Sequence, residues 1–168
     1  MSALIVTAEF GAEDFAWLDG LRSLYYPPER NQVPAHLTLF HALPPSAEPE
    51  ARARLAAAAK APAPRATIAG LMDLGGGVAL RVVSDDLDAI RADLADALHG
   101  LLGARDAGGW RPHVTIQNKV APKESRALIA TFAAEFAPRP LAIYGLGLYR
   151  YLGGPWQKLA LHLFRGRR

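Results

Sequence analysis

Segments with the two-residue apolar repeat of a strand alternate with segments of helical repeat along the chain, and this order is similar in its two halves. Strands are expected at 4–10, 36–40, 66–74, 78–83, 112–118, 141–151 and 156–164. Helices are expected at 13–26, from 49 to about 60, after 84–86 and from 122. The pattern predicts an α+β protein with two similar lobes of antiparallel or mixed sheet and helices on the outside.

The composition favours one globular domain spanning residues 1–168. Hydrophobic residues make up 51% and charged residues 21% of the chain, which is too apolar for disorder. The absence of cysteine excludes disulfide scaffolds, thiolate zinc sites, iron–sulfur clusters and a cysteine nucleophile. No apolar run approaches the roughly 20 residues of a membrane span, and the first residues do not resemble a signal peptide. We therefore expect a cytoplasmic protein, a monomer, with no membrane contact.

Basic residues are concentrated towards the end of the sequence. From Trp110 onwards there are ten lysines and arginines against two glutamates, although the net charge of the whole chain is only +3. This bias is compatible with an anionic ligand, and equally with a solvated basic surface that ends in an arginine-rich tail.

A His-apolar-Thr tripeptide occurs once in each half of the chain. His36-Leu-Thr38 and His113-Val-Thr115 lie on expected strands, each follows a proline within two residues, and each is followed by an apolar residue. The chain has only five histidines and five threonines, so a chance double match is improbable. Both copies therefore indicate function.

The spacing within each tripeptide places its two polar side chains on one face of a strand, about 7 Å apart. If a pseudo-twofold axis relates the halves, the two polar faces meet in one cleft. Two imidazoles can supply a general base and a general acid, and threonine hydroxyls can donate to phosphate oxygens. This set predicts metal-free, cofactor-free phosphodiester chemistry with in-line attack. Strand alternation adds two further residues to this face, Gln117 as a substrate contact and Lys119 as a phosphate ligand.

The residues around both motifs resemble the 2H phosphoesterase superfamily, most closely its bacterial 2′-5′ RNA ligase-like branch. Pro34-Ala-His-Leu-Thr-Leu is similar to the first motif of that branch and Arg111-Pro-His-Val-Thr-Ile to the second. The resemblance implies two lobes with a concave cleft, and cleavage or formation of 2′-linked phosphodiesters, often the opening of 2′,3′-cyclic phosphates. It assigns catalysis to His36 and His113 and phosphate binding to Thr38 and Thr115.

Other candidates have weaker support. Trp110 and Tyr149 are candidate stacking platforms for a base, and Arg150 or Lys158 could contact a second nucleotide. The three remaining histidines are interpreted as structural: His41, His99 and His162. The glycine run at 75–77 is interpreted as a hairpin turn and not as a phosphate-binding loop.

Three functional hypotheses remain open from the sequence. The first is a metal-independent phosphoesterase acting on RNA ends or small cyclic nucleotides, with or without 2′-5′ RNA ligase activity. The second is a non-catalytic RNA- or nucleotide-binding module that uses the same cleft. The third, metal-dependent hydrolysis, is disfavoured because two histidines without a third nearby ligand make a poor metal site. The intact motifs favour the first.

Overall fold

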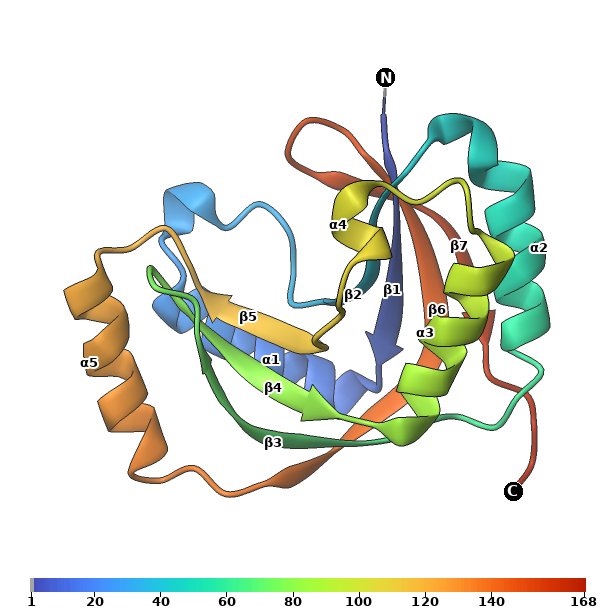
Figure 1. Ribbon diagram of the computed structural model, residues 1–168. Helices are drawn as coiled ribbons and strands as arrows, with labels where there is room; N and C mark the ends of the chain where they lie inside the picture. Colours follow the sequence, from blue (N-terminus) through green and yellow to red (C-terminus); the bar gives the residue numbers. More distant parts are fainter. Residues whose placement is uncertain (1) are drawn as a thin grey trace.

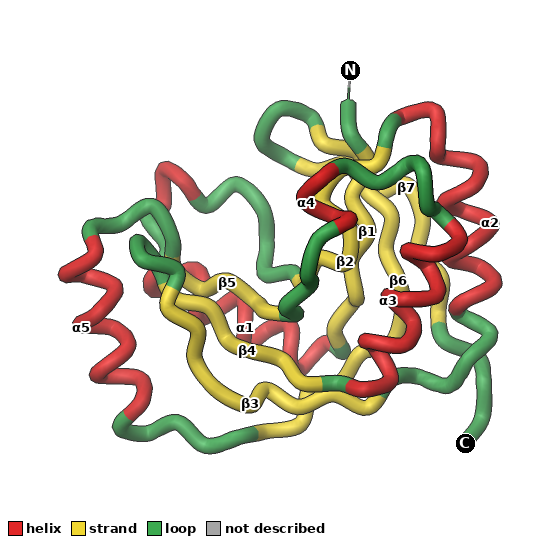
Figure 2. Tube along the Cα trace, in the orientation of Figure 1, coloured by secondary structure: helices red, strands yellow, loops and turns green. Residues whose placement is uncertain are grey.

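The structure, a computed structural model, describes residues 2–168, and within them one antiparallel sheet of seven strands (Figures 1 and 2). The strands are β1 (Leu4–Phe10), β2 (Leu37–Leu43), β3 (Arg65–Asp73), β4 (Val78–Val83), β5 (His113–Gln117), β6 (Arg139–Tyr151) and β7 (Trp156–Leu163). The helices are α1 (Ala12–Tyr25), α2 (Glu48–Ala58), α3 (Asp85–Ala97), α4 (Ala104–Ala107) and α5 (Pro122–Ala133). Short 3-10 turns cover Pro28–Arg30 and Pro45–Ala47.

The long strand β6 joins two similar half-sheets. Its first residues pair with β3, whereas the rest of the strand pairs with β1 on one side and β7 on the other. The main strand order is β2-β1-β6-β3-β4-β5, so one half-sheet contains β2, β1, β6 and β7 and the other contains β6, β3, β4 and β5. The predicted α+β fold with two similar lobes is confirmed.

The helices lie outside the sheet and close its apolar core (Figure 1). Helix α1 packs against β5 and helix α5 against β3 and β4, whereas α2 and α3 pack on each other and on β6, β7 and β3. Helix α1 from the first half of the chain therefore covers a strand of the second half, β5. No helix within residues 2–168 has the length and apolar character needed to cross a bilayer.

Most expected elements are confirmed with bounds within a few residues. The Ser84 hydroxyl caps α3 by accepting a hydrogen bond of 3.0 Å from the amide of Leu87, as an N-cap serine does. Helix α4 is an addition to the expected elements, because four residues between Gly103 and Gly108 are too few to show a helical repeat.

The two strands that carry the repeated motif form opposite ends of the main strand order and contact each other. Strand β2 pairs with β1 and β5 pairs with β4, yet β2 and β5 also come together across the middle of the molecule. The closing of the sheet thus brings residues 36–38 and 113–115 to the same place.

Each of these strands carries the same irregularity directly after its threonine. Between Thr38 and Phe40, and again between Thr115 and Gln117, two residues oppose one residue of the neighbouring strand, which defines a β-bulge. As a result, two consecutive residues point into the core in both strands: Leu39 and Phe40 in β2, and Ile116 and Gln117 in β5. The two halves of the chain therefore repeat the backbone irregularity as well as the His-x-Thr motif.

Edge strands leave carbonyl groups without strand partners, and here buried side chains satisfy them. Arg22 of α1, only 3% exposed, donates from Nη1 to the carbonyl of Thr115 at 3.0 Å and from Nε to Oδ1 of Asn31 at 2.8 Å. On the other edge, Arg91 of α3 donates to the carbonyl of Leu39 at 3.3 Å. The helices thus hold both motif strands by a buried guanidinium.

We predict that Arg22→Met lowers the free energy of unfolding by about 2–4 kcal/mol, because it leaves the Thr115 carbonyl and the Asn31 side chain without their buried donor. Urea denaturation measures this loss. The matched control, Arg126→Met, removes an exposed arginine that forms no ion pair within residues 2–168, and should change stability by less than about 0.5 kcal/mol. Equal effects of the two substitutions would contradict the role given to Arg22.

Candidate active site

The structure brings both His-x-Thr motifs into one cavity of about 380 Å³. His36, Thr38, His113 and Thr115 all line it, although 75 residues of sequence separate Thr38 from His113. The other lining residues come from β1, β2, α4 and the β6–β7 hairpin: Ala3, Ile5, His41, Ala42, Arg105, Tyr151 and Trp156. No carboxylate side chain is among these described lining residues.

The two imidazoles are held in the same way. Nδ1 of His36 lies 2.9 Å from the carbonyl oxygen of Pro34, and Nδ1 of His113 lies 2.7 Å from that of Arg111. A carbonyl oxygen can only accept, so Nδ1 carries the proton in both rings. Nε2 is therefore the free nitrogen of each neutral ring, able to accept a proton and later return it. The backbone two residues before each histidine sets this tautomer.

The two histidines differ in their surroundings. The ring of Trp156 lies 4.5 Å from the ring of His36, centroid to centroid. Burial disfavours the imidazolium form, and the nearby positive charge of Arg22 adds to this effect, so the pKa of His36 falls from 6.5 to about 4. His36 is therefore neutral at pH 7, with Nε2 ready to accept a proton.

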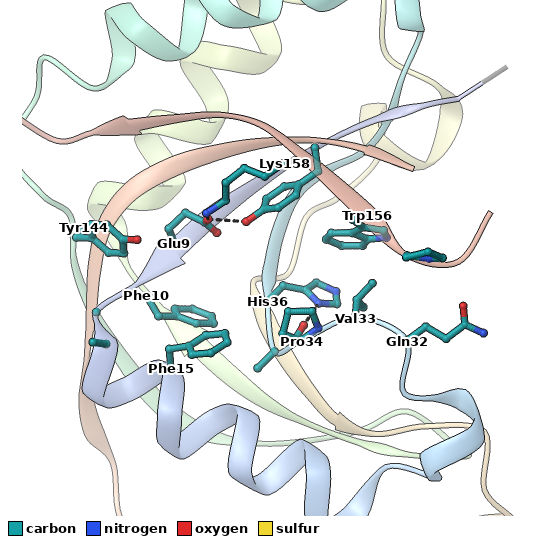
Figure 3. A pocket seen from close by; sticks show the side chains of 15 residues that line it. Glu9, Phe10, Phe15, Gln32, Val33, Pro34, His36, Tyr144, Trp156 and Lys158 are labelled. Carbon is teal, nitrogen blue, oxygen red and sulfur yellow. Dashed lines mark hydrogen bonds and ion pairs between the residues drawn. The ribbon is translucent and has the colours of Figure 1, made fainter. Parts of the chain in front are cut away.

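A second and larger pocket, of about 650 Å³, adjoins the first (Figure 3). The two share His36 and Trp156, so His36 stands where they meet. Phe10, Phe15 and Tyr144 line the second pocket with other apolar groups, and Figure 3 shows Phe10 and Phe15 projecting into it from β1 and α1. We call this space the aromatic pocket. Its flat apolar walls suit an aromatic ring system.

One wall of the aromatic pocket carries a polar cluster centred on Glu9. The Glu9 carboxylate accepts hydrogen bonds from the hydroxyls of Thr7 at 2.9 Å and Tyr149 at 2.5 Å. Nζ of Lys158 lies 3.3 Å from the same carboxylate, and Figure 3 shows Glu9 and Lys158 side by side. Burial and the contact with Glu9 raise the pKa of Tyr149, so its hydroxyl stays protonated and donates. Tyr149 thus lies beside the cavity of the histidines, in the aromatic pocket.

Two residues expected beside the histidines lie elsewhere. The β-bulge after Thr115 turns Gln117 into the interior, where its Oε1 has no hydrogen-bond partner within residues 2–168. Strand β5 ends at Gln117, and Lys119 adopts a left-handed backbone with φ of 62°, so strand alternation no longer determines its direction. Both residues line a separate pocket beside α5. The structure thus does not place Gln117 or Lys119 among the residues that line the cavity of the two histidines.

The other candidates have structural partners. Trp110 donates from Nε1 to the carbonyl of Thr38 at 3.0 Å and so supports the edge of β2, outside both the cavity and the aromatic pocket. Arg150 forms an ion pair of 2.7 Å with Glu48 on α2. Neither Trp110 nor Arg150 lines the cavity or the aromatic pocket.

Part of the basic bias towards the end of the sequence is neutralised in the fold. Four of the ten cations after Trp110 pair with acidic residues earlier in the chain: Arg139 with Asp14, Arg150 with Glu48, Lys158 with Glu9, and Arg168 with Asp86. These pairs do not constitute a free basic surface.

Three residues of the cavity have no clear signal in the sequence. Trp156 begins β7 and could not be placed against His36 from sequence, because the contact joins strands 120 residues apart. His41 stands five residues after His36, on the opposite face of a regular strand, but the bulge turns it back to the cavity. Arg105 lies on the unexpected helix α4. For His41, the sequence does offer one indication that it lies near the site, which is its position on the same strand as the first motif.

Within residues 2–168, no group of three or more histidine, cysteine, aspartate or glutamate side chains is close enough to hold a metal ion.

Two similar half-sheets that bring paired His-x-Thr motifs into one cleft define a two-histidine phosphoesterase fold. The family model described as the 2′-5′ RNA ligase superfamily matches residues 10–155. The chain therefore belongs to the 2′-5′ RNA ligase superfamily, among the 2H phosphoesterases, and the expected resemblance is confirmed.

Solved structures show the same fold over the whole chain. TT0787 of Thermus thermophilus aligns with a TM-score of 0.67 at 19% identity and covers 100% of both chains. E. coli LigT complexed with NADP+ aligns with a TM-score of 0.60 at 21% identity, covering 97% of this chain and 98% of LigT. LigT complexed with 3′-AMP aligns with a TM-score of 0.58 at 19% identity over 97% and 98% of the two chains. A search of curated proteins found no match.

We predict that Trp156→Ala raises the pKa of His36 from about 4 towards 6.5, because water then reaches the imidazolium. NMR titration of the histidine ring carbons measures this shift. The exposed His99 lies outside the cavity, and its ring signals serve as the internal reference in the same spectra. A His36 titration that stays near pH 4 in the variant would show that Trp156 does not cause the depression.

Proposed function

We propose that this protein is a metal-independent phosphoesterase that opens the 2′,3′-cyclic phosphate of RNA ends or small cyclic nucleotides. The observation that carries this proposal is the matched pair of imidazoles, each with Nδ1 bound to a backbone carbonyl and Nε2 free, in one cavity with two threonine hydroxyls. Such a pair supports proton transfer on both sides of a phosphorus atom.

His36 acts as the general base in this scheme. Its neutral Nε2 takes a proton from water as the water oxygen bonds to phosphorus. The bond from phosphorus to the ribose 3′ oxygen breaks in line with this attack, and His113, protonated on Nε2, gives its proton to that oxygen. The products are a 2′-phosphate and a free 3′ hydroxyl. The lowered pKa of His36 supports its assignment as the base.

Thr38 and Thr115 are the phosphate ligands in the proposal. Each threonine follows its histidine by two residues and lines the same cavity, so each hydroxyl can donate to a non-bridging oxygen. Negative charge builds on these oxygens as the water attacks, which makes such donors more effective in the transition state.

The aromatic pocket receives the base of the nucleotide. It meets the catalytic cavity at His36 and offers Phe10, Phe15, Tyr144 and Trp156 as apolar walls. Structures of E. coli LigT with 3′-AMP and with NADP+ support a nucleotide as the kind of ligand for this fold. With the 5′ hydroxyl of another strand in place of water, the same proton transfers in the same direction would form a bond from that oxygen to phosphorus and break the bond to the 3′ oxygen, which is the corresponding 2′-5′ ligase reaction.

We predict that His36→Ala and His113→Ala each lower kcat for adenosine 2′,3′-cyclic phosphate by at least about 10²–10⁴-fold, because each removes one proton transfer. Thr38→Ala and Thr115→Ala should lower it by about 10- to 10³-fold, because each removes one hydrogen bond to the phosphate. Assays include EDTA. A wild type that binds the nucleotide without turnover would support the binding-module alternative, and activity lost in EDTA would support the metal-dependent one.

A plot of the rate against pH should be bell-shaped, and the rise on its acidic side should lie at an unusually low pH. Activity rises as His36 loses its proton, with a midpoint of about pH 4, and falls at higher pH as the general acid loses the proton that the leaving oxygen needs. Measuring kcat/KM across the acidic and alkaline ranges tests this order. A lower limb centred near the ordinary histidine pKa of about 6.5 would contradict the assignment of His36 as the base.

Phe15→Ala should lower kcat/KM selectively for substrates that carry a base. We compare adenosine 2′,3′-cyclic phosphate with ribose 2′,3′-cyclic phosphate, which has no base, and expect the ratio of their kcat/KM values to fall about tenfold, because one stacking surface is lost. Leu24→Ala removes another exposed apolar group of α1, outside the aromatic pocket, and should leave the ratio unchanged. An unchanged ratio in Phe15→Ala would place the base elsewhere.

A further inference from the structure

A third histidine shares the cavity with the catalytic pair. His41 of β2 lines this cavity but not the aromatic pocket, and 29% of its side chain is exposed. Regular alternation from His36 would point it to the opposite face. The bulge between Thr38 and Phe40 shifts the alternation and returns His41 to the side of the two motifs.

A buried carboxylate orients the ring of His41. Asp106 of α4 is only 2% exposed, and its Oδ1 lies 3.0 Å from Nδ1 of His41. The same carboxylate accepts hydrogen bonds from the backbone amides of His41 and Ala42 at 2.9–3.0 Å. Burial acts to raise the pKa of Asp106, but these hydrogen bonds outweigh it and the pKa is lowered, so Asp106 is ionised at neutral pH. Nδ1 of His41 therefore donates to Asp106, and Nε2 is left free; in the doubly protonated ring Nε2 is a second N–H donor, and in this form the ring can bind an anion.

The neighbour of Asp106 in sequence adds a positive charge to the same place. Arg105 lines the cavity, its side chain is exposed, and it forms no ion pair within residues 2–168. It is the sole lysine or arginine among the described lining residues, and no aspartate or glutamate lines the cavity with it. In contrast, Arg139, Arg150, Lys158 and Arg168 are all engaged with carboxylates.

Helix α4 itself is anchored. Arg91, which also bonds the carbonyl of Leu39 at the bulge, donates from Nη2 to the carbonyl of Asp106 at 2.6 Å. One buried guanidinium thus ties α4 to the strand that carries Thr38 and His41. The position of Arg105 and His41 relative to the catalytic groups is therefore held by the core.

From this arrangement we infer that His41 and Arg105 form a binding site for a second phosphate of the substrate. This inference rests on the proposed function and names the substrate class more narrowly. The base occupies the aromatic pocket on one side of His36, and the second phosphate lies at the far end of the cavity. The preferred substrate is a 2′,3′-cyclic nucleotide that also carries a phosphate on its 5′ oxygen, as the last nucleotide of an RNA strand does. Asp106 is a positioning residue for His41.

The first test compares adenosine 2′,3′-cyclic phosphate with and without a 5′-phosphate. The wild type should prefer the 5′-phosphorylated substrate by about 10- to 100-fold in kcat/KM, as expected for charge-assisted hydrogen bonds. Arg105→Gln and His41→Ala should bring this ratio close to one. His41→Gln keeps an N–H donor near the position of Nε2 and should retain more of the preference than His41→Ala.

Matched controls separate this effect from general loss of charge or of histidine. Arg126→Gln and His99→Asn change exposed residues outside the cavity and should leave the ratio at its wild-type value. Thermal unfolding of every variant is measured in parallel. The inference would be overturned if a His41 or Arg105 variant lowered kcat/KM for both substrates equally, so that their ratio kept its wild-type value. Loss of stability would then be the only effect of the substitution.

The second test does not require turnover. Calorimetry with adenosine 3′-phosphate and adenosine 3′,5′-bisphosphate should show about tenfold tighter binding of the bisphosphate by the wild type, lost in Arg105→Gln. Preferential binding without turnover of either cyclic substrate would refute the proposed reaction while supporting the second site. Turnover of both cyclic substrates with equal kcat/KM, and equal affinity for the two probes, would refute the second site while the proposed reaction stands.

Discussion

Both motif strands lie at edges of the sheet, and the site depends on how those edges are held. A free edge offers unpaired carbonyls to water or to another chain. Here Arg22 bonds the carbonyl of Thr115, and Arg91 bonds those of Leu39 and Asp106. Each arginine comes from a helix that packs on the sheet, so helix packing and strand position are coupled. The cavity between β2 and β5 can stay open because neither edge needs the other as a hydrogen-bonding partner.

The repeat makes the two histidines equivalent in geometry, and tertiary packing makes them different in chemistry. Each ring donates through Nδ1 to a carbonyl two residues before it, and each strand has a bulge after its threonine. However, Trp156 covers His36, and the charge of Arg22 also disfavours a second positive charge there. Two histidines in equivalent positions, of which only one is shielded from water, can therefore serve as a general base on one side of the substrate and a general acid on the other.

The distribution of charge along the sequence has a structural explanation. Acidic residues of the first half and basic residues of the second half meet across β6, β7 and the helices that cover them. Such exposed pairs contribute little to stability individually, but they neutralise part of the positive charge that the sequence alone would offer to an anionic ligand. Arg105, in contrast, lines the cavity with the imidazoles and hydroxyls of the two motifs and forms no ion pair within residues 2–168.

Local patterns in the sequence were enough to predict the strands, the four longer helices and the paired motifs, because each depends on neighbours only a few positions away. Tertiary structure decided the rest. The bulges exchanged the expected faces of Gln117 and His41, since a bulge requires a partner strand whose register the sequence does not encode locally. Trp156, Arg105 and Asp106 joined the site through contacts between distant segments, and a four-residue helix leaves no periodic signal.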